Sequence, residues 1–208
     1  MGQILKFPAQ ASKFGYKRVK QRGTNAENPN QLQLFPRPTA QILAFAPDLS
    51  LFEHALLMDE RGDLKAADLY LKAIQEQDCV PDAYCNLGII QSKQGHIAKA
   101  FDCFTTSLQH NPRHFEAHFN LGNMYFDLNE FRLAQVHYEM AAVVDPTFPN
   151  VHFNLALVQA INNDQAGALI SLARYQELVP EDEGRLACEL LNDLRMSLAA
   201  AKNSRPGT

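Results

Sequence analysis

Three asparagines recur along the sequence at one constant interval. Asn86, Asn120 and Asn154 are each separated by 34 residues. An asparagine side chain carries a hydrogen-bond donor and an acceptor on one planar amide. A row of such amides can hold the backbone of an extended peptide whatever side chains the peptide carries.

Histidines are the residues that could bind a metal. His110, His114 and His118 are spaced by four, but Pro112 interrupts any helix that would join the first two. We therefore expect no metal site and no cofactor. The sequence also lacks a phosphate loop and the G-x-S-x-G, G-x-G-x-x-G and H-E-x-x-H motifs, so we expect no catalytic activity.

The four cysteines, Cys79, Cys85, Cys103 and Cys188, form no C-x-x-C pair. We expect buried thiols in a reducing compartment. The N-terminus lacks the apolar run of a secretory signal. No stretch approaches the roughly 20 apolar residues that a membrane helix needs. The sequence therefore predicts a cytoplasmic protein with no membrane partner.

The same interval appears at other residue types, which indicates internal repeats. The interval of 34 recurs among prolines and among alanines: Pro112, Pro146 and Pro180; Ala100, Ala134 and Ala168. Ala67 precedes the alanine series by 33 residues. Residues suited to a left-handed helix end share one phase of the repeat: Gly62, Gly95, Asn129 and Asn163.

Each repeat is predicted to contain two helices. Tyr84, Leu87 and Ile90 have helical spacing before a turn, and Phe104 and Leu108 continue it after the turn. Small residues at one position would let the two helices approach closely: Ala55, Gly88, Gly122 and Ala156.

These features resemble the tetratricopeptide repeat (TPR) family over about residues 48–180, in units that start near Asp48, Pro81, Phe115 and Pro149. The resemblance implies an all-α, right-handed superhelix, an α-solenoid of four helix-turn-helix repeats. Unit one departs from the family pattern, because His54 replaces leucine and Cys79 replaces proline. Segment 181–201 is predicted to form a C-terminal capping helix. Its predicted apolar face comprises Leu186, Leu190, Leu191, Leu194 and Leu198.

By the same resemblance, the first helix of each repeat lines a concave binding groove. The implied peptide-binding residues are Asn86, Ile89, Phe119, Asn120, Asn123, Phe126, Phe153, Asn154 and Leu157. The row of asparagines is similar to the repeat region of O-linked N-acetylglucosamine transferase, where such a ladder holds substrate peptides. Asparagine is also common at this position across the family. The apolar residues would favour an apolar or aromatic ligand, or some of them are buried between repeats.

One function of the family is not expected. Repeats that bind the acidic tails of heat-shock chaperones use Lys and Arg at groove positions to clamp carboxylates. The corresponding positions here hold Asp82, Cys85, Glu116 and Phe119, and Lys93 is the one base among the groove positions of units two to four.

Residues 1–46 form a basic arm with four prolines, and we expect it to be largely disordered or docked. Gln31, Leu32, Leu34 and Phe35 match the bacterial sliding-clamp-binding motif Gln-Leu-x-Leu-Phe, and segments 3–7 and 41–45 match it less well. The stretch KFGYKRVKQRG could contact nucleic acid through phosphates and stacking, or serve as a solvated basic tail. The alternative function is thus a nucleic-acid-linked accessory factor.

Charge is distributed unevenly along the chain. Residues 1–40 carry seven bases and one acid, a charge of +6, and the remainder carries 12 bases and 22 acids, a charge of −10. The arm could therefore dock on its own solenoid. We predict a non-catalytic scaffold or adaptor with the arm at 1–46, a TPR domain with its cap at 47–201 and a flexible tail at 202–208. Its partner would be a protein or peptide.

Overall fold

The computed structural model describes residues 49–189, 192 and 196. Within that range the chain is entirely helical apart from turns. The eight bounded helices are α1 Leu51–Glu60, α2 Ala66–Gln75, α3 Val80–Lys93, α4 Ile97–His110, α5 Phe115–Asp127, α6 Phe131–Val144, α7 Pro149–Ile161 and α8 Gln165–Leu178. Residues 181–189 form a further helical segment. The predicted all-α solenoid of four helix pairs is confirmed.

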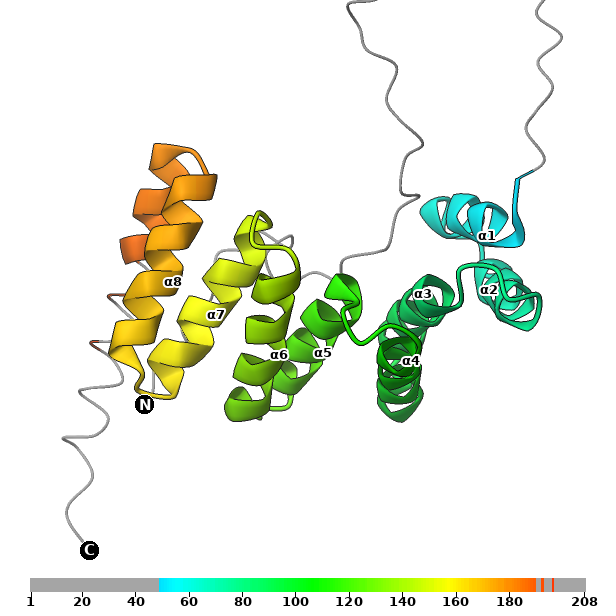
Figure 1. The fold of residues 1–208 in the computed structure, drawn as a ribbon, viewed down its shortest axis with the longest axis horizontal. Coiled ribbons are helices and arrows are strands. Elements are labelled where there is room, and N and C mark those ends of the chain that lie inside the picture. Colours follow the sequence, from blue (N-terminus) through cyan, green and yellow to red (C-terminus); the bar gives the residue numbers. More distant parts are fainter. Residues whose placement is uncertain (1–48, 190–191, 193–195, 197–208) are drawn as a thin grey trace, which may run out of the picture.

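The helices pack in the order in which they follow one another in the chain. The most extensive contacts join α1 to α2, α3 to α4, α5 to α6 and α7 to α8. Each second helix also packs against the first helix of the next pair. Figure 1 shows the pairs arranged along one array with α1 and α8 near its opposite ends. Each repeat therefore contacts mainly its neighbours, as in other solenoids.

Close approach within each pair depends on the predicted small residues. A Cβ atom added to Gly122 would lie 2.6 Å from Cδ1 of Tyr138, and one added to Gly88 would lie 2.8 Å from Cε1 of Phe104. Ala55 and Ala156 occupy the same position and are fully buried. The absence of a large side chain on the first helix thus makes room for an aromatic or aliphatic one on the second helix.

The turns inside the pairs use the predicted left-handed residues. The φ angles are +71° at Gly62, +79° at Gly95, +61° at Asn129 and +66° at Asn163. Glycine and asparagine adopt this conformation at little cost, which explains why the repeat keeps them there.

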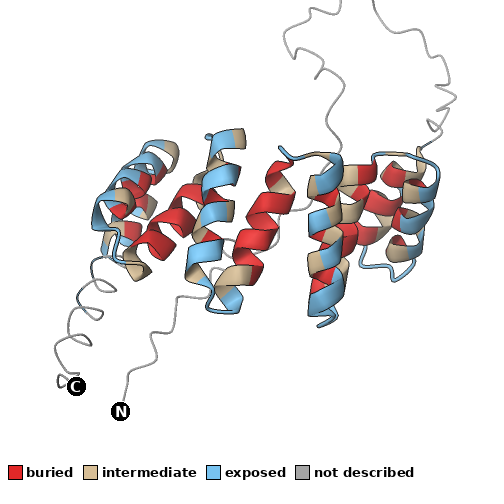
Figure 2. Cartoon of the chain, turned by 60° about the horizontal axis from the view of Figure 1, so that its bottom comes forward, coloured by how far each residue is buried: buried red, intermediate tan, exposed pale blue. Residues whose placement is uncertain are grey.

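The core runs along the array between the pairs. Leu121 of α5 lies in the same cluster as Phe52, Tyr70 and Phe104 of the preceding repeats, and Leu155 of α7 lies in the cluster of the third repeat. The leucine of each Leu-Gly or Leu-Ala pair therefore faces the preceding repeat. Figure 2 shows helices that are buried along most of their length beside helices that expose one side. This arrangement also explains His54, which is exposed because no described repeat precedes α1.

The first repeat differs from the prediction in register. Ala66, and not Ala67, is the buried alanine of α2. Its spacing to Ala100 is 34, as in the other repeats. The first repeat is one residue shorter than the others, and the missing residue lies in the turn after Gly62. As a result, α2 begins at Ala66 itself, whereas α4 begins three residues before the equivalent Ala100. The shortened turn leaves Leu64 84% exposed.

The helical segment at 181–189 covers the end of the fourth repeat. Ala187 is 2% exposed and packs with Phe153, Leu172 and Tyr175, and the Tyr175 hydroxyl donates to Glu183 Oε1 over 2.7 Å. The prediction that Leu186 faces the array is wrong, because Leu186 is 61% exposed. On the side of this helix that faces the fourth repeat, the small side chain of Ala187 allows a closer approach to the array than leucine would. The other four predicted leucines lie outside the described residues.

The cysteines are only partly buried. Cys85 is fully buried, Cys103 and Cys188 are half-buried, and Cys79 is exposed. Burial was therefore the wrong prediction for Cys79. This residue lies in the surface turn before α3, in a left-handed conformation with φ of 48°. All four thiols are free.

Among the described helices none is long and apolar enough to cross a membrane. The predicted arm and the predicted tail lie outside the described residues.

Candidate functional site

The three repeated asparagines lie near the middle of the first helices. Asn86 is on α3, Asn120 on α5 and Asn154 on α7, and each is fully buried. Each precedes by two residues the small residue that touches its own second helix. Because each residue of an α-helix turns the chain by about 100°, each amide lies about 200° around the helix from that contact. The amides therefore point away from the second helices.

Several amides in this row bond to the neighbouring repeat. Asn120 Nδ2 approaches Cys85 Sγ at 3.7 Å, and Asn154 Nδ2 donates to Asn123 Oδ1 over 3.2 Å. The same Asn123 oxygen accepts from the Tyr138 hydroxyl over 2.8 Å. These bonds fix the side-chain orientation of Asn120, Asn123 and Asn154, which is thus set before any ligand binds.

The predicted apolar groove residues belong to the clusters between repeats. Ile89 is in the first cluster, Phe119 in the second, and Phe153 and Leu157 in the third. Phe119 lies 5.4 Å from Phe148 between ring centroids, in an edge-to-face arrangement. Phe126 is half-buried. Their packing in the core is established, and their contact with a peptide stays a prediction.

An acidic pair lies one helical turn before two of the amides. Asp82 and Glu116 lie in the first turns of α3 and α5, with side chains 21% and 15% exposed. His114 is fully buried between them, with Nε2 at 2.7 Å from Asp82 Oδ1 and Nδ1 at 3.6 Å from Glu116 Oε2. The Ala117 N–H donates to His114 Nδ1 over 3.2 Å, so Nε2 carries the proton that bonds to Asp82. The sequence-based prediction missed this link, although both acids share the 34-residue interval.

We predicted that His110, His114 and His118 form no metal site. In the structure, each of these histidines has a different partner. His110 stacks on Tyr84 with ring centroids 5.8 Å apart. His118 Nε2 donates to the Pro112 carbonyl oxygen over 3.1 Å. Its Nδ1 atom must then accept from His137 Nδ1–H, also over 3.1 Å. No group of three potential metal ligands occurs among the described residues.

Burial changes the proton affinity of this histidine pair. Desolvation, with a smaller contribution from the neighbouring His118, lowers the pKa of His137 to about 4. Desolvation likewise lowers the pKa of His118, partly offset by its bond to Pro112. Both rings are therefore neutral at physiological pH, which agrees with a bond that needs one donor and one acceptor.

Two protein-family models match this chain. One describes the tetratricopeptide repeat and matches residues 81–114; the other describes the TPR repeat and matches residues 122–163. These ranges cover the α3–α4 pair and most of the α5–α7 region. Residues 81–114 and 122–163 thus match tetratricopeptide repeats, and the fold is a TPR helical repeat array. Members of this family are typically non-catalytic and serve as protein-interaction scaffolds.

Known proteins resemble this chain over parts of their length. Tetratricopeptide repeat protein 6 of Homo sapiens is 27% identical over 107 residues, 51% of this chain and 21% of that protein. The chain thus spans about a fifth of the length of this curated relative. The similarity to the repeat region of O-linked N-acetylglucosamine transferase stays a prediction.

Solved structures share the fold of the TPR array. A TPR protein from Parabacteroides merdae has a TM-score of 0.60 at 20% identity, covering 71% of this chain and 59% of that one. MamA from Desulfovibrio magneticus has a TM-score of 0.55 at 18% identity, covering 74% and 96%. A thermophilic TPR protein from Thermus thermophilus has a TM-score of 0.52 at 23% identity, covering 71% and 81%.

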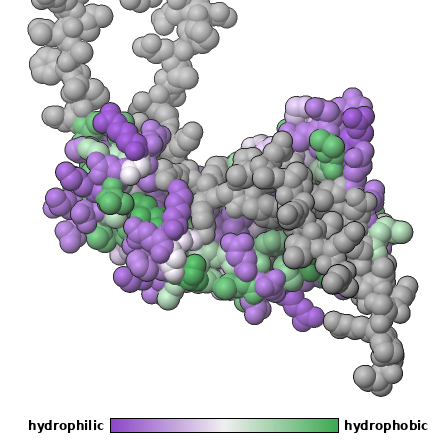
Figure 3. Space-filling view, turned by 180° about the vertical axis from the view of Figure 1, so that it is seen from behind, coloured by the Kyte–Doolittle hydropathy of each residue, from purple (hydrophilic) through white to green (hydrophobic). Residues whose placement is uncertain are grey.

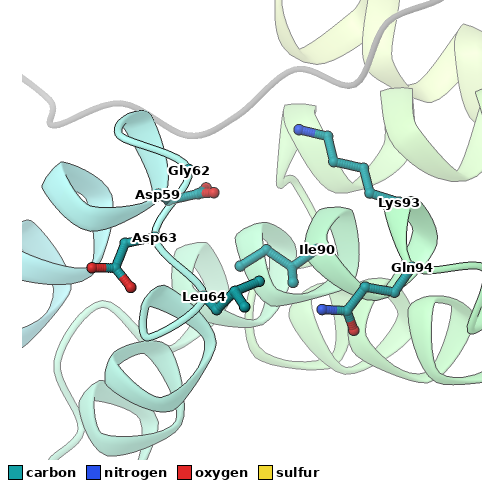
Figure 4. A pocket seen from close by; sticks show the side chains of 7 residues that line it. All are labelled: Asp59, Gly62, Asp63, Leu64, Ile90, Lys93 and Gln94. Carbon is teal, nitrogen blue, oxygen red and sulfur yellow. The ribbon is translucent and has the colours of Figure 1, made fainter.

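A hollow of about 240 Å³ lies between the first and second TPR repeats. Its lining comprises Asp59, Gly62, Asp63, Leu64, Ile90, Lys93 and Gln94. In Figure 4, Leu64 and Ile90 lie near each other in the middle, and Asp59 and Lys93 extend toward each other across the hollow. The sequence-based prediction did not include this hollow. The shortened turn after Gly62 was the signal that could have indicated it.

The TPR array also exposes apolar side chains on α6. Leu133, Val136, Met140 and Val143 are between 41% and 70% exposed. Their spacing of three and four residues places them on one face of the helix. Figure 3 shows apolar residues in separate patches between hydrophilic ones on the face seen there.

The predicted docking motif of Gln31, Leu32, Leu34 and Phe35 lies outside the described residues.

Proposed function

We propose that this chain is a non-catalytic adaptor that binds an extended peptide segment along its first helices. The observation that carries this proposal is a repeated pair of polar side chains four residues apart: Asp82 and Asn86, Glu116 and Asn120, Asn150 and Asn154. Residues four apart lie on one face of a helix. The pair thus recurs in the second, third and fourth repeats, on the side that faces away from the second helices.

The chemistry of this row, named here the amide row and consisting of those six residues, suits a particular ligand. Amides can bond to the donors and acceptors of an extended backbone. The carboxylates of Asp82 and Glu116 favour lysine or arginine side chains, and their low exposure strengthens such charge-assisted bonds relative to fully solvated ones. The preferred ligand is therefore an extended peptide with basic side chains.

Length is required for affinity. A hydrogen bond contributes about 1 kcal/mol net, and association costs several kcal/mol of lost freedom. The polar pair of one helix alone is therefore too weak to bind a peptide measurably. A peptide must contact α3, α5 and α7 together.

A displayed library of short linear peptides, selected against the full chain, tests the proposal. Selected sequences should be rich in Lys and Arg. The double variant Asn120→Ala/Asn154→Ala should bind them about tenfold or more weakly, as the loss of two hydrogen bonds predicts. The matched control Thr105→Ala/Gln109→Ala changes exposed residues of α4. Circular dichroism must show the same helicity in all three proteins. Equal affinities in the amide variant and the control would contradict the proposal.

The alternative function rests on the match of Gln31, Leu32, Leu34 and Phe35 to the sliding-clamp-binding motif. If the arm recruits the chain to a clamp, Phe35→Ala should abolish binding to purified sliding clamp. The control Phe45→Ala, in the weaker copy of the motif, should bind normally. A wild-type chain that does not bind the clamp would end this alternative.

A further inference from the structure

We propose that residues 13–22 of the arm dock on the amide row of the same chain and compete there with external peptides. This inference rests on the proposed function, since it assigns a tethered occupant to the same surface. The occupant is a basic, proline-free segment, and its effect is autoinhibition.

Burial of the amides is the first argument. Asn86, Asn120 and Asn154 have no exposed surface, yet they point away from the second helices of their own repeats. The described contacts bring α6 and α8 against α7, and α3, α4 and α6 against α5. The carboxylates of Asp82 and Glu116 beside them keep 21% and 15% of their surface exposed, and these are the groups of the row that a docked segment can reach.

Charge identifies the segment. Lys13, Lys17, Arg18, Lys20 and Arg22 give residues 13–22 a charge of +5, with no acid among them. The amide row presents Asp82, which bonds to His114 of the next repeat, and Glu116, which lies in that next repeat. Two partly buried carboxylates at neighbouring repeats match bases that are spaced along one extended strand. Attraction between them is screened less than it would be between solvated charges.

Chain length permits the contact. The described chain begins at Leu49, directly before α1, so 26 residues separate Arg22 from it. A flexible linker of that length has a root-mean-square span of roughly 28 Å, from about 5–6 Å times the square root of the residue number. Helices pack about 8–10 Å apart, so α5 lies within the reach of such a linker. Effective concentration is highest when the linker length matches the span.

Tethering makes a weak contact sufficient. A short flexible linker gives an effective concentration of about 1 mM. If the isolated segment bound with a Kd of about 100 µM, the docked form would exceed the open form about tenfold. An external peptide would then bind the full chain about tenfold more weakly than it binds a chain with an inactive arm.

A carbodiimide reagent tests the contact directly, because it joins lysine amines to carboxylates only when they touch. In the full chain we expect joined peptides between residues 13–22 and those that contain Asp82 or Glu116. Asp82→Asn/Glu116→Gln should abolish these products, since it removes both carboxylates and keeps their shape. The control Asp102→Asn/Glu139→Gln removes two exposed acids from α4 and α6 and should leave the products unchanged.

A mixture of isotope-labelled and unlabelled protein distinguishes docking within one chain from docking between two copies. Products confined to one chain, in a mixture of heavy and light protein, support docking within the chain. Products that join heavy to light chains show exchange between copies and overturn it. An absence of products at both acids also overturns it.

Peptide affinity separates this proposal from the proposed function. Lys17→Glu/Arg18→Glu/Lys20→Glu should bind the library-selected peptides about tenfold more tightly than wild type. Equal affinity in the two proteins overturns the docking and leaves the proposed function intact. If neither protein binds any selected peptide, both proposals fail.

Discussion

Two aromatic side chains fill the space that glycine leaves inside the central repeats. Tyr138 lies against Gly122 and Phe104 against Gly88, and both aromatic side chains are fully buried. The Tyr138 hydroxyl also donates to Asn123, one of the predicted peptide-binding residues. A single contact therefore supports both the packing of α5 on α6 and the orientation of an amide beside the proposed ligand.

We expect Gly122→Ala to destabilise the protein by about 1–3 kcal/mol, because its new Cβ would lie 2.6 Å from the Tyr138 ring. Denaturant unfolding measures the change. The fourth repeat combines alanine with leucine at these positions, as Ala156 and Leu172. Gly122→Ala/Tyr138→Leu should therefore lose less stability than the sum of its two single changes. Additive losses would show that the clash is not the cause.

The histidine pair gives the chain a pH dependence at the residue scale. The pKa of His137 is about 4 in the folded protein against an ordinary value of 6.5. As the pH falls below about 6.5 the unfolded chain therefore binds a proton that the folded chain refuses, and stability declines until about pH 4. Solvent screens the half-buried ring, so the decline is about 1–2 kcal/mol.

His137→Gln should flatten this dependence. The glutamine amide can still donate to His118 Nδ1 but cannot bind a proton. Unfolding free energies measured at pH 7 and pH 4.5 should differ less in the variant than in wild type. His96→Gln, at an exposed histidine in the turn before α4, is the control and should keep the wild-type slope. An unchanged slope in His137→Gln would contradict the assignment.

At the scale of elements, the repeat pattern was predictable and the details of its ends were not. The interval of 34 placed α3, α5 and α7 within one residue of their observed starts at Val80, Phe115 and Pro149. It misplaced the buried alanine of α2, because a deletion in a turn can lie on either side of a helix start. Packing against α1 decides that Ala66 is the buried alanine. A single sequence does not contain that information.

The capping helix illustrates the same limit. Leucine spacing suggested an apolar face that includes Leu186, but Ala187 is the residue that packs on the array. Helix periodicity gives the spacing of a face and not its direction. Burial of Asn86, Asn120 and Asn154 was unforeseen for a related reason, since family resemblance assigned those residues to a binding groove.

Ala187→Glu should destabilise the fourth repeat strongly. A glutamate at this 2% exposed site would place an unpaired charge among Phe153, Leu172 and Tyr175. We expect a loss of more than about 2 kcal/mol in thermal or denaturant unfolding. Leu186→Glu introduces the same side chain one residue earlier, where leucine is 61% exposed, and should change stability by less than about 0.5 kcal/mol. Similar losses in both variants would contradict the packing of this helix on the array through Ala187.

At the scale of the whole molecule, the contacts among the described helices run mainly between neighbouring repeats. The ends of such an array should open more easily than its middle, because they have one neighbour instead of two. The first pair is also the shortest, with helices of 10 residues against 13 or 14 in α3 to α8. Its stability therefore depends heavily on local features such as the capping box of Ser50 and Glu53 and the bond from the Phe52 N–H to Asp78.

Removing one helix cap at each end tests this coupling. Ser50→Ala deletes the cap of α1, and Asp164→Ala deletes the side chain that accepts the Gly167 N–H at α8. Each change should cost about 1 kcal/mol. Because repeats interact mainly with their neighbours, amide hydrogen exchange should accelerate in α1 and α2 for Ser50→Ala and in α7 and α8 for Asp164→Ala. Exchange in α5 should change less in both. If each variant accelerated exchange equally throughout, the array would unfold as one cooperative unit, and a ligand bound along α3, α5 and α7 would then stabilise the end repeats as much as the central ones.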